Sequence, residues 1–425
     1  MDTIFALSSG APPAGIAIIR ISGPGAGNAL AALAGRLPEP RVARLASLRD
    51  EAGRLLDRGL VLWFPGSGTA TGEDLVELHL HGGRAVVAAL EGALARMPRV
   101  RRAEAGEFTR RAFVNGRIDL AEAEGLADLL EAETELQRAA ALAAADGALS
   151  RRVEAWRQRV VELSATVESH LDFADEGDVT SRPAERLDAM LTLLADELGE
   201  ALRGPSAERL REGFRVALAG PPNSGKSTLF NALVGSEAAI AAPVPGTTRD
   251  VLERPIALAG IPFTFVDMAG VHDGANDEIE RIGIARAQAE ISRADRVLWL
   301  GPETRGPAGA WEIEAQCDRP DHPHKVNPRH RLSAISGEGV ASLRADLIAA
   351  AGELAPKPGH GAISQRQRSL LSDAHQSLSL ARDQSDPLIL AELLRRARIS
   401  FDRLVGRAAP EDVLNALFAR FCIGK

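Results

Sequence analysis

The stretch GPPNSGKST, residues 220–228, has the spacing G-x-x-x-x-G-K-[ST] that is typical of a phosphate-binding loop. It follows the apolar run FRVALAG and precedes the helical run TLFNALVG, which is the strand-loop-helix context that this motif requires. In such a loop the backbone N–H groups point at phosphate oxygens, a lysine adds a positive charge, and a serine hydroxyl binds Mg²⁺. We therefore expect the phosphate-binding residues to be Asn223, Ser224, Gly225, Lys226, Ser227 and Thr228, with Ser227 as a Mg²⁺ ligand.

Two further motifs follow in the order that a phosphate-sensing switch requires. GTTRD (246–250) can place Thr248 on Mg²⁺ and the γ-phosphate, and DMAG (267–270) ends a strand-like run with a carboxylate near the metal. The nucleotide contacts expected from these motifs are Gly246, Thr247, Thr248, Asp267, Met268, Ala269 and Gly270. Three ordered motifs predict a nucleotide hydrolase.

The base-reading motif is degenerate. A GTPase needs a carboxylate aimed at the N1–H and N2–H₂ groups of guanine, usually in the tetrad N-K-x-D, and that tetrad does not occur in the sequence. We prefer DRPD (318–321), because it follows the alternating segment WEIEAQC and keeps a carboxylate, Asp321. HKVN (324–327) would place an amide there, and a third possibility is that neither segment reads the base. The base-contacting loop at the end of the domain is expected at Ser333, Ala334 and Ile335.

The group that activates water is a second open point. In Ras-like enzymes a glutamine after D-x-x-G orients the attacking water. Here that position is Val271. Either hydrolysis is slow or another group orients the water.

Different kinds of secondary structure surround these motifs. Residues 1–118 contain strand-like runs at 15–22, 59–64 and 74–81 and a helical stretch at 84–96. In the third run, alternation places Val76, Leu78 and Leu80 on one face and Leu75, Glu77 and His79 on the other. Arg20 likewise lies opposite Ile19 and Ile21.

Helical periodicity dominates residues 119–212. One apolar stripe runs from Val153 to Leu171, DFADEGD (172–178) interrupts it, and a second stripe runs from Leu187 to Leu202. Residues 213–355 alternate strand and helix signals, LAPKPGHG (354–361) forms a linker, and helical periodicity resumes at 363. We expect an α/β domain inserted into a helical domain, with segments 1–118, 119–212, 213–355 and 356–425.

Composition limits the class of protein. The chain has 425 residues, of which 45% are apolar, a share that is ordinary for a globular protein. Its net charge of −8 argues against a broad basic surface that would bind nucleic acid. No apolar stretch approaches the ~18 residues of a membrane span, and two cysteines, Cys317 and Cys422, fit a reducing compartment. We expect a cytoplasmic protein with no membrane association.

Motifs along the whole chain resemble the MnmE (TrmE) family of tRNA modification GTPases. They are DTIFAL near the start, RISGPGA (20–26), TGEDLVELHLHGG (71–83), AEAGEFTRRAFVNGRIDLAEAE (103–124), GTTRD, ERIGIARA (280–287) and the terminal FCIGK. The resemblance implies an N-terminal α+β folate-binding domain, an all-α domain, and a Ras-like P-loop G domain inserted in the helical one. It also implies a homodimer whose G domains approach one another when GTP and K⁺ bind.

The activity that the resemblance implies is a tRNA modification. Such proteins act with the FAD-dependent partner MnmG to place a carboxymethylaminomethyl or aminomethyl group on carbon 5 of the wobble uridine, position 34, of certain tRNAs. The one-carbon unit comes from a 5-formyl- or methylene-tetrahydrofolate. One alternative is a switch-type GTPase that acts in ribosome assembly or as an RNA-binding factor. Another is that the G domain has lost nucleotide specificity and serves mainly as a scaffold.

The resemblance also implies a K⁺ site, in which Asn223 and backbone oxygens of residues 242–247 hold the ion in the place of an arginine finger. The ligands would be Asn223, Ala242, Val244 and Thr247, and the loop Ala242, Pro243, Val244, Pro245 would contact the nucleotide. Glu280 corresponds to the acid that positions the hydrolytic water, with a solvated helix-face residue as the alternative.

The folate contacts implied by the resemblance are Arg20, Glu77, Arg117 and Lys425. A carboxylate such as Glu77 can accept two parallel hydrogen bonds from a pterin edge, although Arg20 and Glu77 could instead form a structural ion pair. At the end of the chain the resemblance places Cys422 near the modification chemistry, where a catalytic thiol and a buried structural thiol are both open.

Overall fold

The computed structural model describes residues 2–172, 183–235, 252–268, 288–352 and 361–424. Its contacts divide the chain into two compact units. The first comprises residues 1–127, 150–157 and 398–425, and the second comprises residues 128–149 and 158–397. No helix in these described ranges is long and apolar enough to cross a lipid bilayer.

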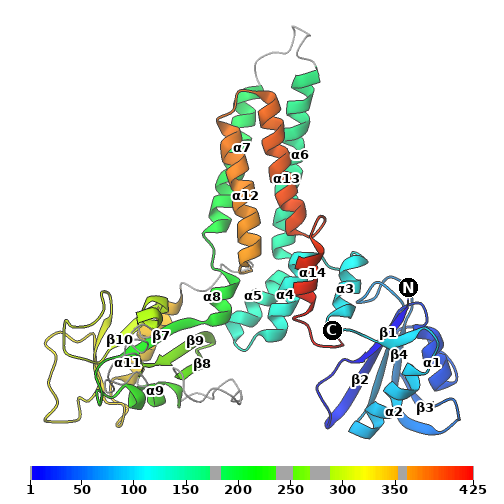
Figure 1. Cartoon of the computed structure of the whole chain (residues 1–425), viewed down its shortest axis with the longest axis horizontal. Helices are drawn as coiled ribbons and strands as arrows, with labels where there is room; N and C mark the ends of the chain where they lie inside the picture. The colour runs from blue at the N-terminus through cyan, green and yellow to red at the C-terminus, as the bar shows by residue number, and fades with distance from the viewer. Residues whose placement is uncertain (1, 173–182, 236–251, 269–287, 353–360, 425) are drawn as a thin grey trace, which may run out of the picture. The chain divides into compact units, whose positions relative to one another are not determined.

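The first unit contains a six-stranded sheet in the order β3-β4-β5-β2-β1-β6 (Figure 1). Its strands are β1 (Thr3–Leu7), β2 (Ala14–Ser22), β3 (Arg44–Arg49), β4 (Leu55–Phe64), β5 (Leu75–Gly82) and β6 (Val100–Arg102). The pair β1 and β6 is parallel, and the other neighbours are antiparallel. The helices of this unit are α1 (Ala26–Ala34), α2 (Arg84–Ala95), α3 (Glu107–Val114), most of α4 (Leu120–Glu131), and α14 (Glu411–Phe418).

One face of this sheet is covered by α1 and α2. The other face is open at Ile16, Leu45 and Leu60, whereas at β1 Ile4 and Ala6 are covered there by Phe108 of α3. The inward residues of β2 and β5, such as Ile19 and Leu78, are fully buried in a core shared with α1 and α2. This confirms the predicted alternation, because Glu77 and His79 lie on the opposite face with Arg20.

The C-terminal segment of the first unit packs against α3 and α4. Leu414, Leu417, Phe418 and Phe421 form an apolar cluster with Leu120 and its neighbours in α4. Beyond this cluster, Ile423 forms a β-bridge with Ala105, which precedes α3. The end of the chain is therefore anchored on the helices of its own unit.

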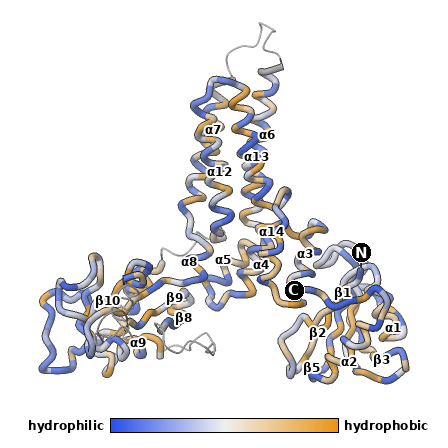
Figure 2. The backbone as a smooth tube through the Cα atoms, in the orientation of Figure 1, coloured by the Kyte–Doolittle hydropathy of each residue, from blue (hydrophilic) through white to orange (hydrophobic). Residues whose placement is uncertain are grey.

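The second unit includes a helical bundle, whose helices lie side by side in Figure 1. Its helices are α5 (Glu135–Ala145), α6 (Ala148–Asp172), α7 (Pro183–Leu202), α8 (Ala207–Glu212), α12 (Gln365–Arg382) and α13 (Pro387–Leu404), of which α6 and α13 extend into the first unit. Buried residues recur along α6 as the apolar stripe predicts, and Figure 2 shows hydrophobic residues interspersed along these helices. The predicted break at 172–178 lies almost wholly outside the described residues.

The second unit also contains a sheet in the order β12-β11-β10-β7-β9-β8. Its strands are β7 (Phe214–Ala219), β8 (Leu252–Leu258), β9 (Ile261–Asp267), β10 (Arg296–Trp299), β11 (Trp311–Glu314) and β12 (His330–Arg331). All neighbours are parallel except β8 and β9. Helices α9 (Lys226–Val234) and α11 (Val340–Ala351) share its apolar core. This is the wound α/β domain that the sequence predicted.

The connection from β10 to β11 departs from the predicted alternation. Residues 300–310, all of which the structure describes, form no helix. The loop packs tightly on the indole ring of Trp299 at two glycines. A Cβ atom on Gly301 would lie 2.4 Å from the ring, and one on Gly306 would lie 2.6 Å from it, so neither position has room for a side chain. This loop therefore takes the place of a crossover helix.

Candidate nucleotide-binding site

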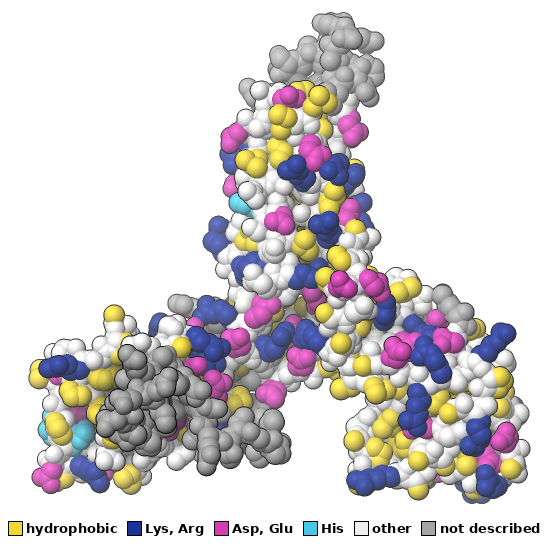
Figure 3. All heavy atoms as spheres, in the orientation of Figure 1, with side chains coloured by type: hydrophobic (Ala, Val, Ile, Leu, Met, Phe, Trp, Pro, Cys, Tyr) yellow, Lys and Arg dark blue, Asp and Glu magenta, His cyan; other side chains and the backbone are white. Residues whose placement is uncertain are grey.

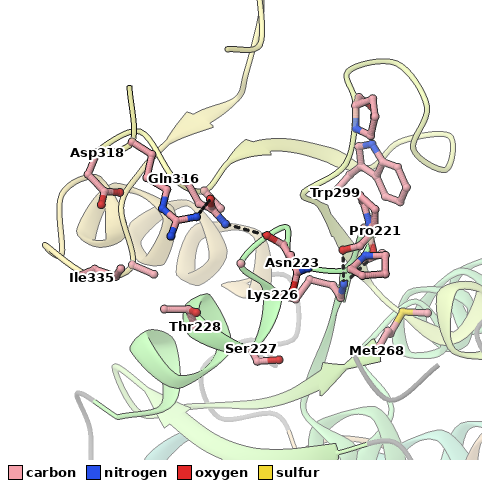
Figure 4. A pocket seen from close by; sticks show the side chains of 18 of the residues that line it. Pro221, Asn223, Lys226, Ser227, Thr228, Met268, Trp299, Gln316, Asp318 and Ile335 are labelled. Carbon is pink, nitrogen blue, oxygen red and sulfur yellow. Dashed lines mark hydrogen bonds between the residues drawn. The ribbon is translucent and has the colours of Figure 1, made fainter. Parts of the chain in front are cut away.

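A cavity of about 1130 Å³ lies at the carboxyl ends of β7, β9 and β11, where open α/β sheets bind ligands (Figure 4). Its described lining is Ala219, Gly220, Pro221, Pro222, Asn223, Gly225, Lys226, Ser227, Thr228, Met268, Ile291, Trp299, Pro302, Ala315, Gln316, Asp318, Arg319, Ala334 and Ile335. The predicted phosphate loop forms one wall of this cavity.

The loop after β7 adopts a backbone that few residue types tolerate. Gly220, Asn223 and Gly225 have φ angles of 152°, 62° and 92°. Asparagine is among the few non-glycine residues that occupy the left-handed region readily. The loop then leads into α9 at Lys226, so the N–H groups of the first helical turn face the cavity.

The ammonium group of Lys226 is held inside this loop. Its Nζ donates to the carbonyl oxygens of Gly220 and Pro221, both at 2.8 Å. Burial lowers the pKa of Lys226, and the nearby carboxylate of Asp267 opposes that effect. A partly desolvated cation at a helix N-terminus is suited to binding phosphate oxygens.

Hard oxygen donors are present for Mg²⁺. The hydroxyl of Ser227 lines the cavity, and the buried carboxylate of Asp267 ends β9 close enough to Lys226 to affect its pKa. Within the described ranges no three His, Cys, Asp or Glu side chains gather as a metal cage. Since Mg²⁺ in nucleotide sites usually takes one or two protein ligands and the substrate phosphates, these donors fit it.

Several predicted contacts lie outside the described residues. They are Ala242, Pro243, Val244, Pro245, Gly246, Thr247, Thr248, Ala269, Gly270, Glu280 and Lys425. Their roles stay predictions.

At the base end the structure does not bring Asp321 into the cavity. Asp321 is exposed and absent from the lining, whereas Asp318 and Arg319 line it. The HKVN segment also lies elsewhere, because Lys325 is buried, with its Nζ donating to Glu312 at 2.6 Å and to the carbonyl of Trp299. In the structure β11 ends at Glu314, so the chain reaches the cavity at Asp318, earlier than the DRPD register assumed.

Gln316, Asp318 and Arg319 line the cavity, and none of them was among the expected contacts. Gln316 Nε2 donates to the carbonyl of Asn223 at 3.0 Å, and Arg319 Nη1 donates to Gln316 Oε1 at 3.2 Å. From the opposite wall Ala334 and Ile335 line the cavity, while Ser333 is fully buried and bridged to Gln316. The available signal in the sequence was a carboxylate, Asp318, four residues after the end of β11.

A second predicted site lies in the first unit. Arg20 and Glu77 face each other across β2 and β5, and the Nη2–Oε1 distance is 2.8 Å. Burial would raise the pKa of Glu77, but the hydrogen bond and charge of Arg20 outweigh it and lower that pKa. The structural ion pair considered above is thus formed. Arg117 is exposed, with its side chain beside Gly72.

Cys422 lies on the tail that runs along the first unit. Its side chain is exposed and it is a free cysteine. The alternative of a buried structural thiol is therefore wrong for the chain as described.

A mostly parallel sheet with a phosphate loop after β7 and a carboxylate at the end of β9 defines a P-loop nucleotide hydrolase. Residues 3–117 match the family model "GTP-binding protein TrmE N-terminus", and residues 120–422 match the model "MnmE helical domain". The chain belongs to the MnmE family of tRNA modification GTPases.

Curated relatives match from end to end. The tRNA modification GTPase MnmE of Erythrobacter litoralis is 62% identical, with 100% of each chain covered. The same protein of Novosphingobium aromaticivorans is 59% identical, again with 100% of each covered. The solved G domain of the T. maritima FeoB iron transporter is 24% identical and covers 32% of this chain and 98% of its own, at a TM-score of only 0.25.

Proposed function

We propose that this GTPase acts with an FAD-dependent MnmG-type subunit on certain tRNAs. The pair would install a carboxymethylaminomethyl or aminomethyl group at carbon 5 of the wobble uridine, position 34. The single observation that carries the proposal is a phosphate-loop cavity in a chain that is 62% identical over its whole length to a tRNA modification GTPase. The four segments 1–118, 119–212, 213–355 and 356–425 are proposed as its domain boundaries, and the cytoplasm as its location.

In the proposed G site, Lys226 and the loop N–H groups bind the phosphates of GTP. Ser227 and Thr248 would hold Mg²⁺, with Asp267 nearby, and this ion would neutralise phosphate charge during transfer to water. The proposed K⁺ ligands are Asn223 and residues of the loop 242–247. Glu280 would orient the attacking water through a bridging water.

In the proposed folate site, Glu77 recognises the pterin edge of a tetrahydrofolate. Arg20 holds Oε1 of Glu77, with distances of 2.8 and 3.2 Å from its two nitrogens, which orients the carboxylate. The second oxygen, Oε2, faces His79 at 3.4 Å, a weaker contact that a pterin N–H could replace. Arg117 and Lys425 would supply charge for the rest of the cofactor, and Cys422 would act near the modified base.

A homodimer would cover the open face of the first sheet. Ile16, Leu45 and Leu60 on that face are 61%, 68% and 45% exposed. Figure 3 shows exposed hydrophobic side chains on this unit. Leu45 and Leu60 are paired neighbours on β3 and β4, so they form one exposed apolar patch. Such a patch supports a symmetric pairing through the N-terminal domain.

Hydrolysis by the purified full-length protein tests the proposed G site. GTP should be hydrolysed in the presence of Mg²⁺, faster in KCl than in NaCl, and Lys226→Ala should abolish the activity. Equal rates in both salts would remove the K⁺ site, and hydrolysis by the Lys226→Ala variant would place the chemistry elsewhere.

A further inference from the structure

Arg215 joins two elements on one face of the sheet that carries the phosphate loop. It is the second residue of β7, and its side chain is only 9% exposed. Its Nη2 donates to Oε1 of Glu253 on β8 at 2.8 Å and to Oε2 of Glu290, within the helical residues 288–293, at 2.7 Å. Because β9 lies between β7 and β8, this guanidinium reaches across a strand and bridges two carboxylates from separate parts of the chain.

The face on which this bridge lies has a small apolar core. β7 contributes only Ala217 and Ala219 to that core, and Ile291 of the helical residues packs against it. The opposite face of the sheet buries larger side chains, among them Phe214 and Phe263. Burying an alanine removes much less apolar area from water than burying a phenylalanine. We therefore expect the helical residues to depend on the charged bridge for a precise position.

Removing the guanidinium would leave two like charges close together. The side chain of Glu290 is 13% exposed and that of Glu253 is 46% exposed, so water screens the first of them poorly. Burial by itself would lower the pKa of Arg215, but the hydrogen bonds and charges of the two carboxylates raise it, so the guanidinium stays charged. Among the described residues, Arg293 is also near Glu290, but its distance of 3.6 Å is too long for a hydrogen bond.

One end of the bridge borders the nucleotide cavity. Ile291, which follows Glu290 in the chain, lines the cavity, as does Met268 after β9 (Figure 4). Arg215 itself and both of its carboxylate partners are absent from the described lining. A change at Arg215 would therefore reach the site through the element that carries Ile291, and not through contact with the nucleotide.

The elements that Arg215 joins also continue from two motifs of the proposed G site. β8 begins two residues after GTTRD, and the helical residues begin directly after ERIGIARA. The proposed metal ligand Thr248 and the proposed water-positioning acid Glu280 belong to these motifs. The phosphate loop has separate contacts, since Lys226 donates to two carbonyl oxygens of the loop itself.

We infer that Arg215 is a positioning residue for GTP hydrolysis, which acts on turnover and not on nucleotide binding. Through Glu253 and Glu290 it holds β8 and the helical residues 288–293 at a fixed separation, and this aligns the groups that act on the γ-phosphate and the attacking water. The inference rests on the proposed G site and adds a residue that does not touch GTP.

Steady-state GTP hydrolysis and equilibrium binding of a fluorescent GTP analogue, both with the full-length chain, test the inference. Arg215→Met keeps an unbranched side chain but removes the bridging nitrogen. Its kcat should fall by about 10–100-fold, the scale of a small misplacement of reacting groups, and its Kd should change by less than about twofold. Arg215→Lys keeps a cation with three donors, so its kcat should return to within about threefold of the wild-type value.

Arg254→Met is the matched control, because Arg254 is the exposed arginine next to Glu253 on β8. It should keep the wild-type kcat. Glu290→Ala should lower kcat as Arg215→Met does, and the double variant should be no slower than either single variant, because the two residues act through one bridge. A wild-type kcat in Arg215→Met, or additive losses in the double variant, would overturn the inference.

A merely structural role would have a different signature. If Arg215 only stabilised the fold, the fraction of chains that bind the GTP analogue would fall in proportion to kcat, and that result would overturn the inference. A full binding stoichiometry together with a low kcat supports it. If Arg215→Met binds no nucleotide, Glu290→Ala decides by the same two criteria. A wild-type chain that binds no GTP would instead overturn the proposed G site.

Discussion

The hydroxyl of Ser8 donates a hydrogen bond to the carbonyl oxygen of Gly424, 2.9 Å away, across 416 positions of sequence. The β-bridge between Ala105 and Ile423 lies beside it. Together these contacts hold the end of the helical segment on the N-terminal sheet domain of the same chain. They hold the terminal segment that carries Cys422 on the unit that also contains the proposed folate residues Arg20 and Glu77.

Gly424→Ala should detach this tail. Gly424 has φ +99°, and a Cβ there would lie 2.1 Å from the carbonyl oxygen of Leu7. We expect at least a tenfold loss of 5-formyltetrahydrofolate affinity, measured by calorimetry, with GTP hydrolysis unchanged. Gly53→Ala is the control, since Gly53 has φ +75° and open space around its Cβ position, so it incurs only about 1–2 kcal/mol of backbone strain. Equal folate affinity in the two variants would contradict a role for the tail.

Cys422→Ser should show whether the thiol has a chemical role that is independent of the stability of the fold. The side chain is exposed, so the free energy of unfolding should change by less than about 0.5 kcal/mol. If the thiol takes part in the chemistry, tRNA modification should fall by about 100-fold, a scale typical of losing a catalytic group, while GTP hydrolysis persists. Full modification by the serine variant, measured by nucleoside mass spectrometry, would leave Cys422 without a chemical role.

The Arg20–Glu77 pair should contribute a pH-dependent part of the stability. The pKa of Glu77 is lowered in the folded chain from an ordinary value of 4.5, so the stabilisation is present above pH 4.5 and is lost as the pH falls through the lowered pKa. Glu77→Gln should therefore cost about 1 kcal/mol at neutral pH and progressively less below pH 4.5 in urea unfolding. If the difference in unfolding free energy between wild type and Glu77→Gln stayed constant across this pH range, the Arg20–Glu77 pair would not be the source of the pH dependence.

Asn223→Gly should remove the response to K⁺. Glycine accepts the φ of 62° at this position, so the variant deletes the side-chain amide without straining the loop. We expect the rate of GTP hydrolysis in KCl to fall to the rate in NaCl. Asn327→Gly, an exposed residue of the same domain outside the cavity, should keep the stimulation. Stimulation that survives in Asn223→Gly would assign K⁺ to other ligands.

Leu60→Asp should dissociate the proposed dimer. Leu60 is 45% exposed on the open sheet face, where a carboxylate would be desolvated on pairing. Light scattering should show a monomer for this variant and a dimer for the wild type. Leu193→Asp, on α7 and 56% exposed, is the control and should remain dimeric. A dimeric Leu60→Asp protein would place the interface elsewhere.

Local sequence patterns predicted those elements whose structure follows from the spacing of residues within the element itself. The alternation around Glu77, the stripe along α6 and the strand-loop-helix at Lys226 each follow from a short-range period or spacing, and the structure has all three. These signals lie within the segment itself. Packing from elsewhere in the chain was not needed to find them.

The residues that line the cavity after β11 could not be found in this way, because tertiary contacts decide where β11 ends. Glu314 is fully buried in that strand and bonds to His324, Lys325 N and Arg331, which no alternating pattern predicts for a carboxylate. Only these contacts show that Gln316, Asp318 and Arg319 reach the cavity and that Asp321 does not. The missing helix between β10 and β11 likewise depends on the fit of Trp299 to its loop.

The central claim is that GTP hydrolysis at Lys226 drives modification of the wobble uridine. The direct measurement is the amount of carboxymethylaminomethyl- and aminomethyl-uridine in tRNA from cells whose own gene for this protein is deleted and replaced by wild-type or Lys226→Ala chains. Modified nucleosides should return with the wild-type chain and stay absent with the Lys226→Ala chain at equal protein level. Equal restoration by both chains would contradict the claim.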